Sequence, residues 1–420
     1  MPTLIKNAKI FHDMFDILIA DGKIKEIAPN IKLHDGVVID AKNKLVTPGL
    51  IDVHVHFREP GQTHKETVAS GSKAAAHGGF TTVFAMPNVT PTIDTPEAFE
   101  NIMDKNITDG IVNIKQYAAI SKGLLDEKVN ELGKLAELGA VGFTNDGHGV
   151  QTADTMLRAM QTAYTLNKPI IAHVEDDSLL HGGVLNAGAT ADRLKLPGMT
   201  GLSESSQLAR DLVLAAKAKV HYHVAHISTK ESVELVRIAK KYGVNVTAEV
   251  TPHHLLLADH MIENDNAMFK MNPPLRSEED RKALIAGLLD GTIDMIATDH
   301  APHSKAEKAG SMVTAAFGIT GLETAFSLIY TFFVKTGIFT IEQLIMWMAN
   351  KPAKIFNLES GVLEVGKPAD ITIFDTDQEF EIREENFYSK GKNTPFIGQQ
   401  VYGRTMLTMV AGKVIYKENY

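Results

Sequence analysis

Two histidines separated by one residue end an apolar run in this sequence. The run covers residues 46–56 and closes with His54-Val-His56. Side chains at positions i and i+2 of a strand point to the same side. His54 and His56 would therefore project together from the end of a strand, where neutral imidazoles can share one divalent metal ion. A His-x-His pair also arises by chance, so this pair alone does not establish a metal site.

Further histidines and aspartates end later apolar runs. They are Asp146, His173, His226 and Asp299. Taken singly, Asp146 before Gly147 is more typical of a turn residue than of a ligand, and a lone histidine such as His173 is usually a core or surface residue. Metal-binding residue types at the ends of several strands predict one shared site. A carboxylate beside such a site can take up and return a proton, which makes Asp299 the candidate general acid/base.

The run over residues 220–228 holds three histidines. Strand alternation separates His226 from His221 and His223, so a regular strand cannot direct all three to one side. His226 is nearest the C-terminal end of the run. We predict that His221 and His223 are packing residues.

Arg58 follows His56 by two residues and is the candidate for binding a substrate carboxylate. Its planar guanidinium can donate two parallel hydrogen bonds to such a group. The alternative is a surface ion pair with Glu59 or Glu66. His300 and His303, just after Asp299, are candidates for contacting the substrate.

Strand-like runs alternate with amphipathic helical segments through the middle of the chain. The eight runs cover residues 46–56, 81–87, 112–120, 140–146, 169–175, 220–228, 244–251 and 293–300. This alternation predicts an α/β fold with a closed (β/α)8, TIM-like barrel, whose active sites lie at the C-terminal ends of the strands. The candidate ligands all occupy those ends. Short apolar segments separated by turns at both ends of the chain predict one small β domain. We therefore expect a β domain from residues 1–45 and 352–420, and a barrel from residues 46–351.

Composition narrows the function classes. The 420 residues include 44% hydrophobic and 22% charged residues, as in ordinary globular proteins. The formal charge of −9 without basic blocks argues against nucleic-acid and membrane partners. The absence of cysteine leaves His, Asp and Glu as metal ligands. With no secretory signal pattern and no apolar run long enough to span a bilayer, we expect a cytoplasmic protein.

Eight motifs resemble those of the amidohydrolase superfamily and, within it, of the bacterial type I dihydroorotases. They are Asp-Val-His-Val-His-Phe-Arg-Glu-Pro-Gly (52–61), Ala-Met-Pro-Asn (85–88), Phe-Thr-Asn-Asp-Gly (143–147), Ala-His-Val-Glu (172–175), His-Ile-Ser-Thr-Lys (226–230), Thr-Pro-His-His-Leu (251–255), Lys-Met-Asn-Pro-Pro-Leu-Arg (270–276) and Ala-Thr-Asp-His-Ala-Pro-His (297–303). Any one motif is weak, but eight in order over the whole chain are specific.

The resemblance implies a zinc-dependent reaction that interconverts dihydroorotate and N-carbamoyl-L-aspartate, a step of pyrimidine biosynthesis. It implies one or two zinc ions per subunit, with two favoured, and Asp299 as general acid/base. The implied metal ligands are His54, His56, Asp146, His173, His226 and Asp299. The implied substrate contacts are His56, Arg58, Asn88, Asn272, His303, Phe317 and Gly318. A homodimer and an association with aspartate transcarbamoylase are compatible with the resemblance, and the sequence decides neither.

Two departures from the family pattern bear on these expectations. Relatives such as hydantoinases bridge two metal ions with a carbamylated lysine, but no lysine lies between Lys134 and Lys168. Asp146 would therefore supply the bridge. Ala316 stands before Phe317-Gly318 where the family commonly has proline, which would loosen that loop. We expect residues 304–318 to form a lid over the substrate, with a disordered connector as the alternative.

Two other functions compete with this interpretation. One is a different cyclic-amide hydrolase, such as a hydantoinase or an allantoinase, although Arg58 and Asn88 favour a substrate with a carboxylate. The other is an inactive homologue that serves as a scaffold. The presence of every candidate ligand argues against the scaffold.

Overall fold

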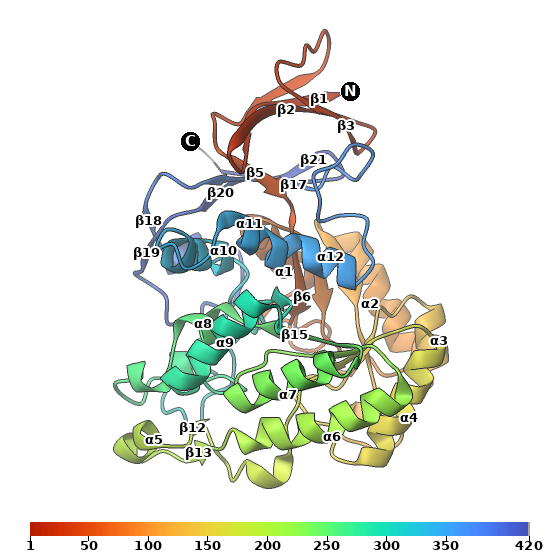
Figure 1. Ribbon diagram of the computed structural model, residues 1–420, viewed down its shortest axis with the longest axis vertical. Helices are drawn as coiled ribbons and strands as arrows, with labels where there is room; N and C mark the ends of the chain where they lie inside the picture. The colour runs from red at the N-terminus through yellow and green to blue at the C-terminus, as the bar shows by residue number, and fades with distance from the viewer. Residues whose placement is uncertain (419–420) are drawn as a thin grey trace.

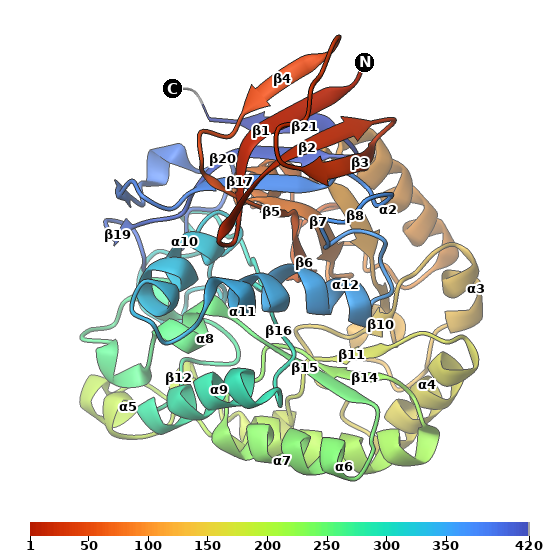
Figure 2. The same ribbon diagram turned by 45° about the horizontal axis from the view of Figure 1, so that its top comes forward.

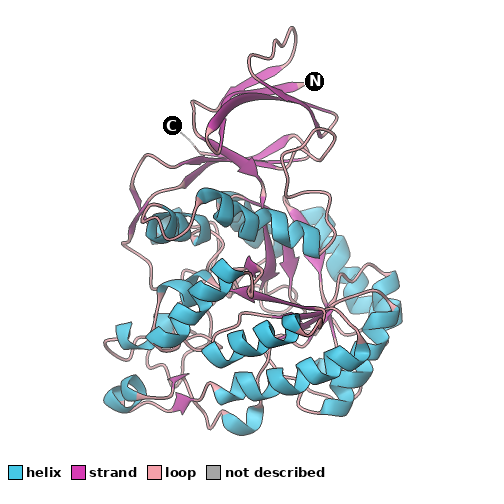
Figure 3. Cartoon of the chain, viewed as in Figure 1, coloured by secondary structure: helices cyan, strands magenta, loops and turns pink. Residues whose placement is uncertain are grey.

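A computed structural model describes residues 1–418 of the chain. A β-sheet lies at one end of the long axis, and a barrel surrounded by helices forms the rest (Figures 1 and 3). Within the described residues, no helix combines the length and apolar character needed to cross a membrane.

Strands from both ends of the chain form the first sheet. Its strands are β1 (Thr3–Ile10), β2 (Asp13–Ala20), β3 (Lys23–Ala28), β4 (Val37–Asp40), β5 (Leu45–Pro48), β17 (Ile371–Asp375), β20 (Arg404–Val410) and β21 (Lys413–Lys417). Figure 2 shows its early and late segments side by side. Asp21-Gly22 joins β2 to β3 with φ of 52° and 72°, the conformation that a tight two-residue hairpin requires.

The sheet has its own apolar core, which includes Ile5, Ile17, Val46, Ile371 and Leu407. Strand β5 pairs with β17 and extends the sheet to Pro48, beyond the boundary expected at residue 45. The division of the chain into two domains stays a prediction.

Eight parallel strand positions form the barrel. They are β6 (Leu50–Val55), β7 (Phe80–Ala85), β8 (Asn113–Gln116) with β9 (Ala118–Ala119), β10 (Phe143–Thr144), β11 (Ile170–Ala172), β14 (Tyr222–Val224), β15 (Val246–Val250) and β16 (Met295–Ile296). His300 closes the ring because it forms a parallel bridge with Val55 and its carbonyl accepts the His56 N–H at 2.9 Å. The predicted (β/α)8 barrel is confirmed.

The expected first run, residues 46–56, is two strands rather than one. The chain leaves β5 and enters β6 at Gly49, where an added Cβ would lie 2.2 Å from Thr81. This close approach explains why glycine occurs there.

Helices surround the barrel strands. They are α1 (Val68–His77), α2 (Pro96–Asp109), α3 (Leu132–Glu137), α4 (Ala153–Thr165), α5 (Ala189–Leu194), α6 (Leu202–Ala218), α7 (Lys230–Lys241), α8 (Pro252–Leu256), α9 (Glu278–Asp290), α10 (Ala325–Ile329), α11 (Ile341–Ile345) and α12 (Lys351–Ile355). Two short strand pairs complete the fold, β12 (Leu185–Asn186) with β13 (Gly198–Met199) and β18 (Phe380–Glu381) with β19 (Gln400–Val401).

Hydroxyl residues fix the start of several helices. Thr67, Thr95, Thr152, Thr229 and Ser277 each accept a hydrogen bond from the third residue of the helix that follows. Such caps satisfy backbone N–H groups that have no partner within the helix. The caps stabilise the first turns of helices that cover the barrel, and the barrel positions the strand ends at which the candidate ligands lie.

Candidate metal centre and substrate pocket

Six side chains meet at the C-terminal ends of the barrel strands. They are His54, His56, Asp146, His173, His226 and Asp299, none more than 5% exposed. His54 lies in β6, and the others follow the ends of β6, β10, β11, β14 and β16 within three residues. The structure thus brings together all six candidate ligands that the family resemblance implies.

The backbone leaves strand geometry at two of these residues. His226 has a φ of 31° and Asp299 a φ of 47°, both in the left-handed region that non-glycine residues seldom adopt. The His226 N–H donates to Glu249 Oε1 at 3.2 Å, which helps to hold this conformation. Such strain persists where surrounding contacts enforce it, commonly at functional sites.

Two overlapping groups of side chains could each hold a metal ion. One is His54, Asp146 and His226, the other His54, His56 and Asp299, and in each the ligand atoms lie within 4.8 Å of one another. Asp146 stands between them, with Oδ1 3.2 Å from His54 Nε2 and Oδ2 3.4 Å from His56 Nε2. His173 joins on one side, with Nδ1 2.9 Å from His226 Nε2.

The unpaired atoms of the cluster fit a metal ion. His54 Nε2 and Asp146 Oδ1 are buried and lie 3.2 Å apart, but neither has a hydrogen bond of regular geometry to a described residue. Burial would raise the pKa of Asp146, but His54 and His226 hold it well below its usual range. Burial would lower the pKa of His54, but Asp146, Glu249 and Asp299 raise it well above its usual value. Carboxylate and imidazole atoms that converge without partners are a suitable ligand set for a divalent transition metal.

Neighbouring side chains fix how the two strand-end histidines present their nitrogens. His54 Nδ1 lies 2.6 Å from Glu249 Oε1, and His56 Nδ1 lies 2.9 Å from Asn88 Oδ1. Each Nδ1–H can therefore donate outward, which leaves Nε2 facing the carboxylates of the cluster as the candidate ligand atom. This arrangement is usual for metal-binding histidines.

Sequence reasoning gave Glu249 no role. The Glu249 carboxylate contacts His54 and also lies 3.0 Å from His223 Nε2. Burial would raise the pKa of Glu249, but His54 and His223 lower it. The available signal was a single acidic residue inside the apolar strand β15. His221 and His223 both bond Thr247 Oγ1 at 2.7 Å and lie outside the two ligand groups.

A cavity of about 190 Å³ opens beside the cluster, and the seven substrate contacts that the family resemblance implies all line it. Those residues are His56, Arg58, Asn88, Asn272, His303, Phe317 and Gly318. His300, the other candidate for a substrate contact, does not line this cavity, and its Nδ1 instead accepts the Gly321 N–H at 3.2 Å. Asn88 has a second contact, because its Nδ2 lies 3.3 Å from Asp146 Oδ2. Asn272 Nδ2 donates to Glu175 Oε2 at 2.6 Å.

Arg58 is, among the described residues, the one arginine or lysine that lines this cavity. Its side chain is buried, Nε donates to the Pro302 carbonyl at 3.2 Å, and Nη2 lies 3.3 Å from His303 Nε2. Burial lowers the pKa of Arg58 to about 10, so the guanidinium stays charged at neutral pH. Burial and Arg58 lower the pKa of His303 to about 2, so its imidazole is neutral. The alternative, a surface ion pair of Arg58 with Glu59 or Glu66, does not form among the described residues.

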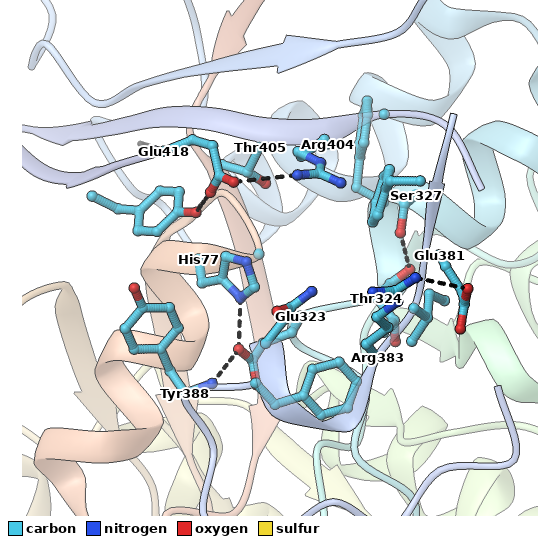
Figure 4. A pocket seen from close by; sticks show the side chains of 18 of the residues that line it. His77, Glu323, Thr324, Ser327, Glu381, Arg383, Tyr388, Arg404, Thr405 and Glu418 are labelled. Atoms are coloured by element: carbon cyan, nitrogen blue, oxygen red, sulfur yellow. Dashed lines mark hydrogen bonds and ion pairs between the residues drawn. The ribbon is translucent and has the colours of Figure 1, made fainter. Parts of the chain in front are cut away.

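A larger cavity of about 390 Å³ lies away from the cluster. Figure 4 shows its charged side chains paired with each other, as where His77 Nδ1 and the Tyr388 N–H meet Glu323 Oε1 at 2.6 and 2.7 Å. Arg404 Nη1 likewise lies 3.3 Å from Glu418 Oε1. The smaller cavity, where buried polar atoms lack hydrogen bonds, is therefore the candidate functional site.

The sequence matches a model of the amidohydrolase family over residues 45–415. A dihydroorotase of Ligilactobacillus salivarius is 58% identical over 425 residues, covering 99% of both chains. A dihydroorotase of Pediococcus pentosaceus is 55% identical over 422 residues, again covering 99% of both.

Solved structures of hydantoinases have a similar fold. L-hydantoinase from Arthrobacter aurescens has a TM-score of 0.89 and 27% identity, covering 100% of this chain and 96% of its own. D-hydantoinase from a Thermus species has a TM-score of 0.86 and 27% identity, covering 99% of this chain and 95% of its own.

Proposed function

The chain belongs to the amidohydrolase family, and we propose that it is a dihydroorotase, which reversibly hydrolyses dihydroorotate to N-carbamoyl-L-aspartate in pyrimidine biosynthesis. The observation that carries this proposal is a buried guanidinium, Arg58, that lines the same small cavity as the candidate metal ligands. A cyclic amide with a carboxylate substituent matches both features. The names of relatives that are 55–58% identical over the full chain support the same substrate.

We assign the metal ligands as His54, His56, Asp146, His173, His226 and Asp299. The metal proposed is zinc, at one or two ions per subunit, and the two overlapping ligand groups favour two. Asp146 is the proposed bridge because its two carboxylate oxygens face different histidines. When bound, zinc lowers the pKa of water and polarises the amide carbonyl.

Asp299 is the proposed general acid/base. Burial would raise its pKa, but His54 and His56 lower it, so the carboxylate is ionised and able to accept a proton at neutral pH. Its Oδ1 lies 2.9 Å from His56 Nε2, which places it at the centre of the cluster. In hydrolysis Asp299 takes a proton from the attacking water and gives it to the departing ring nitrogen, and ring closure reverses these transfers.

The remaining cavity residues orient the ring. Arg58 donates to the substrate carboxylate, since in the structure its Nη1 has no hydrogen bond to a described residue. Asn272 Oδ1 and His303 Nδ1 are buried without hydrogen bonds to the described residues, so each can accept a hydrogen bond from the substrate. Phe317 and Gly318 form the adjacent wall, and His56 and Asn88 contact the substrate from the metal side.

Metal analysis and a hydrolysis assay on one preparation test this proposal. We expect bound zinc, turnover of dihydroorotate, and little turnover of hydantoin or dihydrouracil, which lack the carboxylate. Asp299→Asn is the matched variant, and it should lower kcat by about a hundredfold or more. Faster turnover of hydantoin than of dihydroorotate would instead support a hydantoinase, the activity of the solved structures with a similar fold. Metal-loaded protein inactive on every ring would support the scaffold interpretation.

Location and assembly remain predictions. We propose a cytoplasmic enzyme that acts as a homodimer and is able to associate with an aspartate transcarbamoylase. Light scattering of the purified protein, alone and mixed with the transcarbamoylase of the same organism, tests both assemblies.

A further inference from the structure

Two segments of the chain form adjacent parts of the cavity wall. Phe317 and Gly318 come from the loop after the candidate general acid/base, and Asn272 comes from the segment between α8 and α9. The Gly318 N–H donates to the Lys270 carbonyl at 3.0 Å. The Phe317 carbonyl lies 2.7 Å from His303 Nε2. The position of this wall therefore decides how Phe317, Gly318 and Asn272 meet a substrate.

A lysine side chain links the two segments. Lys308 is 3% exposed, and its Nζ donates to the carbonyls of Lys270, Ala316 and Gly318 at 3.0, 2.9 and 3.0 Å. An ammonium group has three N–H donors, so each donor has one acceptor. The three carbonyls belong to both sides of the wall, and Lys308 thus joins segments that no regular strand pairing connects within the described chain.

A second lysine supports the same segment. Lys270 Nζ donates to the Ala315 carbonyl at 2.6 Å and lies 4.1 Å from the centre of the Phe317 ring. The Ala316 N–H in turn donates to the Glu307 carbonyl at 2.8 Å. Residues 315–318 are therefore held by backbone and side-chain contacts from two directions.

We propose that Lys308 is a positioning residue for substrate binding: it holds Phe317 and Gly318 against the segment that carries Asn272, so that the three residues contact the ring together. The identity of the ring rests on the proposed function. The lid expected for residues 304–318 stays a prediction, and the Lys308 contacts are those that fix its position in this structure.

Burial of a lysine side chain at position 308 has an energetic cost. Lysine is seldom fully buried, and burial together with Lys270 lowers the pKa of Lys308 to about 7. An apolar side chain of equal length would fill the same space without that cost. What the lysine adds is its set of hydrogen bonds to the wall.

The other contacts of the three carbonyls indicate how loss of the Lys308 ammonium would affect the wall. The Gly318 carbonyl also accepts from Asn393 Nδ2 at 3.0 Å, and the Lys270 carbonyl also accepts from the Gly318 N–H. Among the three, the Ala316 carbonyl has no other donor within the described residues. Removal of the ammonium should therefore loosen the wall rather than unfold the barrel.

Lys308→Met tests the proposal, and Lys305→Met is the matched control, because Lys305 lies on the same loop with its side chain 86% exposed. Assays at pH 6.5 keep Lys308 mostly protonated. We expect Lys308→Met to raise KM for dihydroorotate at least tenfold, with kcat changed less than threefold and metal content unchanged. Lys305→Met should match the wild type. If Lys308→Met does not fold, Lys308→Gln replaces it, and a smaller rise in KM is expected because the amide keeps two donors.

Restoring the ammonium separates its role from simple filling of space. The chain has no cysteine, so Lys308→Cys offers a single thiol that can be alkylated in denaturant before refolding. Bromoethylamine recreates an ammonium at the length of lysine, and bromopropane gives the same length without one. Wild-type protein taken through the same treatment controls for other alkylation. We expect the aminoethyl form to recover the low KM and the propyl form to keep the high one.

Amide hydrogen exchange tests the proposal in the absence of substrate. Residues 315–318 should exchange faster in Lys308→Met than in the wild type or in Lys305→Met. Unchanged exchange, an unchanged KM in Lys308→Met, or equal KM values in the two alkylated forms would overturn the role of Lys308. A wild-type enzyme inactive on dihydroorotate would overturn the proposed function instead, and the exchange comparison would still stand.

Discussion

Replacement of Arg58 by methionine should remove the preference for a substrate that carries a carboxylate. Arg58 is 8% exposed, and its Nε and Nη2 atoms contact Pro302 and His303. Its Nη1 has no hydrogen bond to a described residue, so this edge of the guanidinium is available to a ligand. Methionine has a similar length and would fill most of the space without a donor.

The magnitude follows from the hydrogen bonds to the carboxylate that methionine cannot make. A hydrogen bond to a charged group contributes about 1.5–3 kcal/mol, and removal of the guanidinium should cost about 2–4 kcal/mol in binding of the transition state. This corresponds to a fall of about thirty- to thousandfold in kcat/KM for dihydroorotate. Dihydrouracil has the same ring without the carboxylate, and its kcat/KM should change less than about threefold.

The assay compares kcat/KM of the wild type and the variant on both rings, with metal content measured in each sample. Arg58→Lys is the matched control, since it keeps the charge but cannot donate two parallel hydrogen bonds, and it should show an intermediate loss. An equal loss on both substrates would refute the reasoning, because it would mean that Arg58 acts only by supporting Pro302 and His303.

Three further predictions concern the cluster and its surroundings. His56→Ala should lose bound zinc and turnover while its circular dichroism spectrum stays that of the wild type; full zinc and full rate would contradict the ligand assignment. Glu249→Gln should weaken metal binding about ten- to hundredfold in competition with a chelator, because His54 loses its charged partner; an unchanged affinity would show that Glu249 does not orient His54. Burial would raise the pKa of Glu204, but Arg276 lowers it, so the folded-state pKa lies below the unfolded value of about 4.3. The ionised carboxylate therefore stabilises the fold at pH values above the unfolded pKa, and this stabilisation is lost as the pH falls through the folded-state pKa. The free energy of unfolding in urea should therefore drop more steeply between pH 5 and pH 3 in the wild type than in Glu204→Gln, and parallel curves would exclude this contribution.

The sequence by itself was enough to predict the barrel and to select the six candidate ligands. Apolar runs alternate with amphipathic segments. This alternation is a local property of the sequence, so it can be recognised without knowing which residues pack against one another in the fold. Parallel strands of a barrel all end on one face, so residues at the ends of runs converge wherever the runs lie in the chain. Asp146 and Asp299, far apart in sequence, could thus be assigned to one site.

Tertiary structure alone decided which residues support that site. Glu249 bonds His54 across 195 positions, and only the side-chain contact reveals it. Asn88 was expected to bind substrate, yet it also bonds His56 and Asp146. Sequence reasoning assigned Lys308 no role, and only the structure shows that it is buried with three carbonyl contacts. Burial and hydrogen bonding depend on what packs against a residue, and a periodic pattern records only which side of an element faces inward.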